Sequence, residues 1–370
     1  MIYLDNAATT FPKPKSVIKE IEKCITNYCA NAGRSSHTLA TKTGEEIYNT
    51  RECIADFLSF DRPENICFTT NATYALNFAI KSLIIEKCHV LISDLEHNSV
   101  LRPVNKLTKE VGIEYSIFET KGDIYENIKR LIRPNTKAII STLTSNVSGK
   151  EIPISLLSKI SKEYSLIFIA DASQCIGHKK IDLSTTPCDA LCAPGHKGLF
   201  GIQGVGFIVF DKNRPQKTLI EGGSGNESKK LNMPNYLPEK MEAGTLPTPA
   251  IVALKAGIKY ISSIGLNEVS DKLNELTNYL KQRLENINSI ELFGAENGII
   301  SFKIKNKNAN ECASILDEYG ICTRAGLHCA PLAHKTLGTE DFGLIRVSLS
   351  IFNKKSDIDF LLKTINNVFV

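Results

Sequence analysis

The stretch Ala193-Pro194-Gly195-His196-Lys197-Gly198-Leu199, which leads into the glycine-rich Phe200-Gly201-Ile202-Gln203-Gly204-Val205-Gly206, decides how this chain is organised. A lysine held between glycines, just ahead of the β-prone residues 207–210, lies where the backbone can close around a small ligand while the amine points into a pocket. We therefore interpret Lys197 as the covalent anchor of a cofactor. A surface lysine in an ordinary glycine loop would give the same local pattern, so the interpretation depends on the rest of the chain.

The segment upstream of this loop supplies a carboxylate. Residues 166–170 form a short apolar run that ends in Asp171-Ala172-Ser173-Gln174, which predicts a buried parallel strand with Asp171 at its carboxyl end. Open α/β sheets bind their ligands at that edge. An Asp there and a Lys on the next structural unit are the pair that pyridoxal phosphate needs, because the carboxylate keeps the pyridine nitrogen protonated and the amine forms a Schiff base. An Asp that simply caps the following helix is the alternative.

An ordered set of motifs resembles a known family. Residues 171–174 and 195–197, preceded by Glu96-His97 and by Ser145-Asn146-Val147-Ser148-Gly149, are similar to the class V, fold-type I pyridoxal phosphate enzymes, and specifically to the cysteine desulfurases. Further matches run from Tyr3-Leu4-Asp5-Asn6-Ala7-Ala8-Thr9 to Arg346-Val347-Ser348-Leu349-Ser350, so the resemblance covers nearly the whole chain.

Four successive strand–loop–helix units predict an α/β fold with a doubly wound, mostly parallel sheet. The resemblance implies that this sheet is of the seven-stranded type and belongs to a large cofactor-binding domain over residues 16–250. It also implies a small α+β domain from residues 1–15 and 251–370, which carries a catalytic cysteine loop.

Composition limits the kind of partner. Of the 370 residues, 42% are hydrophobic and 23% charged, which are globular values, and the net charge of +4 gives no nucleic-acid footprint. No run is long enough to span a bilayer and the N-terminus has no basic leader, so we expect a cytoplasmic protein without membrane contact that acts on a small molecule. The eleven cysteines lack framework spacing and CxxC pairs, so we expect neither disulfides nor a metal site.

Several residues are candidate cofactor ligands. Ala72 and Thr73 follow the predicted strand 66–70 and open a helix, where free N–H groups and the helix dipole favour a phosphate, although a plain N-cap by Thr70 or Asn71 would look identical. The resemblance implies that His97 stacks on the pyridine ring and moves protons. It implies further that Asn146 and Gln174 donate to the phenolic oxygen and that His196 helps hold the phosphate. Thr245 would reach the phosphate in a partner subunit, which implies a homodimer with shared active sites.

The resemblance also implies a substrate site. Arg346 matches the arginine that binds the substrate α-carboxylate, and a planar bidentate donor suits that task. Arg34 matches an arginine at the substrate mouth, and we also place Asn6, Ala8 and Arg324 among the substrate-binding residues. The plainer alternatives are a solvent-facing strand arginine for Arg346, a solvated loop for Arg34, a structural histidine for His97 and a helix-capping turn for Thr245.

One cysteine stands apart from any apolar periodicity. Cys329 lies in Thr323-Arg324-Ala325-Gly326-Leu327-His328-Cys329-Ala330-Pro331-Leu332, where Arg324 and His328 would favour the thiolate. The segment resembles the catalytic loop of the group II desulfurases and selenocysteine lyases. Two departures are Leu327, where that family often has a second histidine, and Pro194, where it often has a hydroxyl that donates to the phosphate.

We therefore predict a pyridoxal 5'-phosphate-dependent cysteine desulfurase. It converts L-cysteine to L-alanine and leaves the sulfur on Cys329 as a persulfide, and a sulfur-acceptor protein is a possible partner. A selenocysteine lyase or another β-eliminating lyase would use the same Lys197, and a catalytically silent sulfur-relay scaffold would keep the fold alone. A transaminase would leave Cys329 without a task. The polar loop 221–240 is expected to be mobile or to form an interface.

Overall fold

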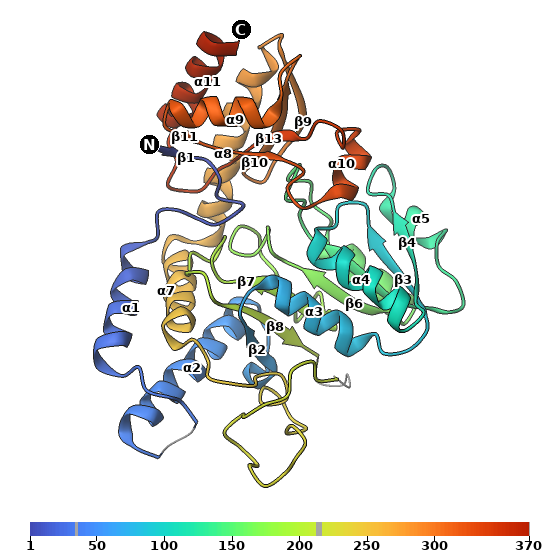
Figure 1. Ribbon diagram of the computed structural model, residues 1–370, viewed down its shortest axis with the longest axis vertical. Coiled ribbons are helices and arrows are strands. Elements are labelled where there is room, and N and C mark those ends of the chain that lie inside the picture. The colour runs from blue at the N-terminus through green and yellow to red at the C-terminus, as the bar shows by residue number, and fades with distance from the viewer. Residues whose placement is uncertain (34–35, 212–216, 370) are drawn as a thin grey trace.

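The structure, a computed structural model, describes residues 1–33, 36–211 and 217–369. Its largest element is a seven-stranded sheet in the order β2-β8-β7-β6-β5-β3-β4 (Figure 1). Only β8 is antiparallel to its neighbours in this sheet. The strands are β2 (Ile66–Thr69), β3 (His89–Ser93), β4 (Glu114–Phe118), β5 (Thr136–Thr142), β6 (Ile167–Asp171), β7 (Ala190–Pro194) and β8 (Gly206–Phe210). The predicted mostly parallel, doubly wound sheet is confirmed.

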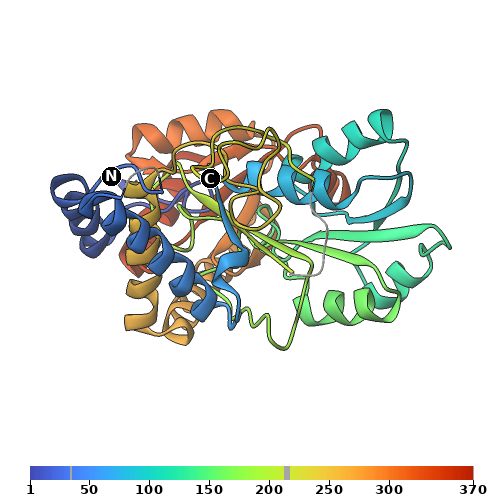
Figure 2. The ribbon, with the colours of Figure 1, turned by 90° about the horizontal axis from the view of Figure 1, so that it is seen from below.

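Helices cover both faces of this sheet because its strands are apolar on both sides. Successive residues of β3 point to opposite faces, so Val90 and Ile92 join one hydrophobic core and Leu91 joins the other. The first core is closed by α3 (Ala72–Leu83) and α4 (Asn98–Glu110), the second by α6 (Ile154–Glu163) among others. Figure 2 shows the sheet between these two helical layers, with the short α5 (Ile124–Lys129) beside the edge strand.

Three helices pack together at the other edge of the sheet: α1 (Lys15–Asn27), α2 (Thr38–Phe57) and α7 (Thr248–Ile264). At Gly265 the chain turns into α8 (Leu266–Glu285), whose Leu273, Leu276, Leu280 and Leu284 are buried as their spacing predicts. No single described helix has the length and apolar character to cross a bilayer; α7 and α8 meet that criterion only when taken together, and they are bent by 81°.

A second, four-stranded antiparallel sheet has the order β12-β13-β10-β9. Its strands are β9 (Ile290–Glu296), β10 (Ile299–Ile304), β12 (Arg324–Gly326) and β13 (Leu344–Ser348), and its helices are α9 (Ala309–Glu318), α10 (Pro331–Leu337) and α11 (Lys355–Phe369). The N-terminal β1 (Ile2–Tyr3) pairs with β11 (Ile321–Cys322), as the expected packing of the first residues requires. β11 and β12 are separate strands, which pair with different partners on either side of Thr323.

Candidate active site

The carboxyl ends of the parallel strands bring the predicted cofactor residues together. Because β3, β5, β6 and β7 run in one direction, the residues that follow or end them meet at one edge of the sheet. All predicted cofactor residues except Thr245 line a single cavity there: Ala72, Thr73, His97, Asn146, Asp171, Gln174, His196 and Lys197. The spacing of motifs along the chain therefore corresponds to one site in space.

The turn that carries Lys197 is fixed by donors from the N-terminal segment. Thr10 Oγ1 donates to the carbonyl of Lys197 at 2.9 Å, and Lys13 Nζ donates to the carbonyl of His196 at 2.8 Å. Gly198 is required in the turn, since a Cβ there would lie 2.2 Å from the carbonyl oxygen of Ile176. Burial lowers the pKa of Lys197 to about 8, although the Asp171 carboxylate opposes the shift. Part of the amine is therefore neutral near physiological pH and able to act as a nucleophile or base.

The amino-terminal ends of α3 and α4 form the anion-binding end of the cavity. Asn71 is the N-cap of α3, and its side chain accepts from the backbone N–H of Tyr74 at 3.1 Å. The alternative of an N-cap by Asn71 is therefore met, and the same turn is the one predicted to bind a phosphate. Thr73 Oγ1 lies 2.8 Å from Ser99 Oγ near the start of α4. His196 Nδ1 is buried and has no hydrogen-bond partner among the described residues. An unsatisfied buried nitrogen beside a helix N-terminus fits a ligand with a phosphate group.

Asp171 lines the cavity, and a second carboxyl group, that of Glu96, is buried near it. Asp171 accepts from the backbone N–H of Ser173 at 2.9 Å. Glu96 lies behind it, with no exposed surface, and accepts from Ser93 Oγ and from the backbone N–H of Thr142. Burial raises the pKa of Glu96 to about 8. In the sequence, Glu96 was recognised only as part of the motif Glu96-His97. Because Glu96 keeps its proton near neutral pH, Asp171 is the carboxyl group that remains to pair with a pyridine nitrogen.

His97 is neutral at this edge. It caps α4, its Nδ1 accepting from the backbone N–H of Ser99 at 3.1 Å, and burial lowers its pKa to about 4. A neutral ring can stack on a pyridine ring without adding a cation. The structural alternative and the catalytic prediction are thus compatible, because the cap uses only one ring nitrogen.

The two amides predicted to face the cofactor also join other segments to the cavity. Asn146 Nδ2 donates to the carbonyl of His328 at 2.8 Å, and Gln174 Nε2 donates to the carbonyl of Ala7 at 3.0 Å. Each amide has a second N–H that these bonds do not use. The cavity wall is therefore connected directly to the cysteine loop and to the N-terminal segment.

Arg346 is buried, with 1% of its surface exposed, so the alternative of a solvent-facing arginine is wrong. Its Nη2 forms an ion pair with Asp5 at 2.7 Å, and its Nη1 donates to the carbonyl of Asn146 at 2.9 Å. The Nε atom has no partner among the described residues. Sequence reasoning missed the role of Asp5, which holds this guanidinium beside the cavity. Asn6 and Ala8 instead hold the N-terminal turn, through Ser348 and Asp5 respectively.

Cys329 is exposed, and Arg324 Nη2 lies 3.8 Å from its sulfur. The expectation that His328 also lies beside the thiol is not met: its ring is buried and turns toward His334. The backbone is strained here, because His328 and Cys329 have φ values of 51° and 56°. Such left-handed conformations cost about 1–2 kcal/mol each for residues with a side chain. The backbone N–H of Asn98 donates to the carbonyl of Cys329 at 2.7 Å and docks the loop next to His97.

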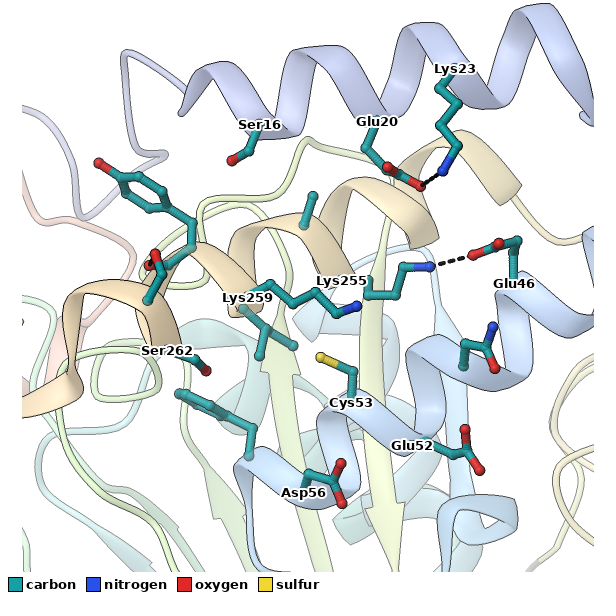
Figure 3. A pocket seen from close by; sticks show the side chains of 16 residues that line it. Ser16, Glu20, Lys23, Glu46, Glu52, Cys53, Asp56, Lys255, Lys259 and Ser262 are labelled. Atoms are coloured by element: carbon teal, nitrogen blue, oxygen red, sulfur yellow. Dashed lines mark hydrogen bonds and ion pairs between the residues drawn. The ribbon is translucent and has the colours of Figure 1, made fainter.

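Two predicted residues lie elsewhere. Thr245 is exposed and lines a separate, mainly apolar pocket with Tyr74 and Phe78. Arg34 lies outside the described residues. A larger hollow of about 880 Å³ lies between α1, α2 and α7 (Figure 3). Its Lys255 forms an ion pair with Glu46, and its Lys23 forms one with Glu20.

Comparison with known proteins relates this arrangement to a family. A family model described as aminotransferase class-V matches residues 2–361. The chain is 31% identical to a probable cysteine desulfurase from Borreliella burgdorferi, over 97% of this chain and 89% of the relative. It is 30% identical to a probable cysteine desulfurase from Methanothermobacter thermautotrophicus, over 99% and 94%. The apo structure of a cysteine desulfurase from Thermococcus onnurineus superposes with a TM-score of 0.91 at 26% identity, covering 100% of this chain and 94% of that chain.

Proposed function

This chain belongs to the class-V aminotransferase family, and on that premise we propose that it is a pyridoxal 5'-phosphate-dependent cysteine desulfurase. It would convert L-cysteine to L-alanine and retain the sulfur as a persulfide on Cys329. One observation carries the proposal: the loop of Cys329 is docked on the wall of the cavity that contains Lys197. The bonds from Asn146 to the His328 carbonyl and from Asn98 to the Cys329 carbonyl make that contact.

The residues of the cavity fit the cofactor. Pyridoxal phosphate, when bound, withdraws electrons from the α-carbon of an attached amino acid. Lys197 would anchor it, Asp171 would pair with its ring nitrogen, and the start of α3 with Thr73 and the unsatisfied His196 would hold its phosphate. Pro194 offers no donor, so we propose that Thr245 of the partner subunit supplies one.

Arg346 would then bind the substrate, and Lys197 and His97 would move the proton of its Cα atom. Arg346 offers guanidinium N–H groups to the α-carboxylate, since its Nε has no partner among the described residues. The amine of Lys197, whose pKa burial has lowered, can take the Cα proton and return it later. Neutral His97 covers the opposite part of the cavity and can relay a proton through its free ring nitrogen.

Cys329 performs the sulfur step. Its thiolate attacks the sulfur of the substrate, so an S–S bond forms while the Cβ–S bond breaks. The electron pair of the broken bond goes to Cβ, which takes up a proton and becomes the methyl group of alanine. Arg324, 3.8 Å from the thiol, supplies the nearby positive charge. The products are alanine and a Cys329 persulfide, which an acceptor thiol would then receive.

A second copy of the chain would complete the site. Thr245 is exposed beside the apolar pocket that contains Tyr74 and Phe78. The adjoining loop, which Figure 1 shows extending past the large sheet, exposes Leu231 completely and Tyr236 by 46%. Apolar side chains gathered in this way favour an interface over a solvated surface. We therefore propose a homodimer in which this face lies against the partner.

The test is alanine release from L-cysteine by the cofactor-loaded protein, with the persulfide located by mass spectrometry. Cys329→Ala should lose both products, whereas Cys29→Ala, at another exposed cysteine, should keep them. L-selenocysteine is assayed in parallel. Alanine from selenocysteine alone, or release from cysteine that ignores Cys329, would refute the proposal in favour of a lyase. The similarity to two probable cysteine desulfurases favours the desulfurase.

A further inference from the structure

The cysteine loop is tied to α10 by side chains that the reaction above does not use. The ring of His328 is 3% exposed and faces His334 of α10, which is fully buried. Nδ1 of His328 lies 3.3 Å from Nε2 of His334, and the two rings lie edge to edge, with their centroids 5.6 Å apart and an interplanar angle of 14°. On its other side, Nδ1 of His334 lies 2.7 Å from the hydroxyl of Thr339.

This chain of hydrogen bonds can run in one direction only. Nε2 of His328 faces the carbonyl oxygen of Arg324 at 3.4 Å, and a carbonyl can only accept, so Nε2 carries the proton. Nδ1 of neutral His328 is then an acceptor for Nε2–H of His334. Nδ1 of His334 in turn accepts from Thr339. Burial lowers the pKa of both histidines, in agreement with two neutral rings.

The backbone of the loop needs such an anchor. Two consecutive side-chain-bearing residues in the left-handed region persist only where surrounding contacts hold them. Asn146 and Asn98 hold the carbonyl groups of His328 and Cys329 from the cavity side. On the opposite side of the loop the side chain of His328 is buried, whereas the side chain of Cys329 is exposed. Of this pair, only His328 can therefore anchor the loop on that side through its side chain.

We propose that His334 and Thr339 are positioning residues, which present Cys329 to the substrate by holding the ring of His328 as the anchor of its loop. His328 acts on the thiol through the backbone and is neither its base nor a charge beside it. The inference rests on the proposed desulfurase function, because that reaction gives the position of the thiol its purpose.

Kinetics of two independent changes test the proposal. His334→Phe keeps a ring and removes both nitrogen atoms. We expect kcat for alanine release from L-cysteine to fall roughly 10–100-fold, since misplacement by about 1 Å has such an effect. KM for cysteine and the visible absorbance of the bound cofactor should not change. His334→Gln keeps a donor near the position of Nε2 and should recover most of the rate. Thr339→Val, which alters only the last bond, should show a smaller loss of the same kind.

Two further measurements need no turnover. Backbone hydrogen exchange over residues 324–331 should be faster in His334→Phe and Thr339→Val, but not in Lys335→Gln, a control at an exposed position of the same helix. The pH midpoint for alkylation of Cys329 by iodoacetamide should stay at the wild-type value in His334→Phe and His328→Gln.

Wild-type kcat in His334→Phe, unchanged exchange, or a shifted midpoint in His328→Gln would overturn the positioning role. If the wild-type protein released no alanine, the proposed function would fail instead. Hydrogen exchange and alkylation would still decide whether the hydrogen bonds between His328, His334 and Thr339 hold the loop.

Discussion

The cavity around Lys197 and the loop that carries Cys329 are built in opposite ways. The cavity residues end or follow parallel strands, so a sheet ladder with buried side chains on both faces fixes their positions. The cysteine lies outside any strand, next to a residue with the same left-handed backbone, and only a few loop contacts hold it. Regular structure therefore positions the predicted cofactor residues, whereas the position of Cys329 depends on individual hydrogen bonds.

The two regions also differ in electrostatics. Burial lowers the pKa of His97 and of Lys197, which line the cavity, and raises the pKa of Glu96, which lies behind its wall. The thiol of Cys329 is exposed, with Arg324 as its neighbouring cation. Substitutions in the cavity should therefore affect stability and cofactor binding, while substitutions of the thiol should affect chemistry alone.

The largest effect is expected for Lys197→Ala. Without the amine the cofactor loses its covalent anchor and the Cα proton loses its proposed base, so alanine release should fall by at least about 10³-fold. Lys259→Ala, in the hollow of Figure 3, is the matched control and should keep its activity. A Lys197→Ala protein within tenfold of the wild-type rate would remove Lys197 from the chemistry.

Glu96→Gln should change the pH dependence of stability. Burial raises the pKa of Glu96 from 4.5 to about 8, so the folded protein keeps a proton that the unfolded chain releases. Stability is therefore lost as pH rises from about 4.5 through about 8, and the glutamine variant lacks this loss, which amounts to a few kcal/mol at most.

Urea unfolding at about pH 5 and about pH 8 would check this. The stability advantage of Glu96→Gln over wild type should grow with pH. Glu52→Gln, at an exposed carboxylate, should show no such trend. An advantage that shrinks with pH would mean that Glu96 is ionised in the folded protein.

Thr73→Val should weaken cofactor binding by roughly tenfold, the value of one hydrogen bond to a charged group. Titration of the apoprotein with pyridoxal phosphate, followed by absorbance, would measure it, with Thr26→Val on α1 as control. An unaltered affinity would mean that the side chain of Thr73 does not bind the phosphate and that other groups hold it.

The smallest effect is expected for the stability of Cys329→Ser. The thiol is exposed, so the free energy of unfolding should change by less than about 0.5 kcal/mol. Cys67→Ser, within β2 and fully buried, should instead cost about 1–3 kcal/mol, because its hydroxyl enters an apolar core. Equal losses in the two variants would contradict the contrast between the large sheet that carries the cavity and the cysteine loop.

Much of the candidate site could be predicted from the sequence because its residues follow strands. Asp171 ends a strand, and Lys197, Asn146 and His97 lie within four residues of the end of another. Parallel strands place such positions at one edge of the sheet. The fold was predictable for the same reason. The edge strand β4 and the helix α10 were missed, since β4 is largely exposed and α10 is short.

The sequence by itself determined the sheet and its ligand-binding edge, and it predicted an anchoring lysine and a reactive cysteine, because period, turn residues and motif order are local properties. Only the tertiary structure decided that Asp5 pairs with Arg346, that Glu96 is neutral, and that His328 turns from the thiol toward His334. These outcomes depend on burial and on contacts between residues far apart in the chain. The free energies of desolvation and hydrogen bonding that settle them exist only once the two sheets and the N-terminal segment have come together.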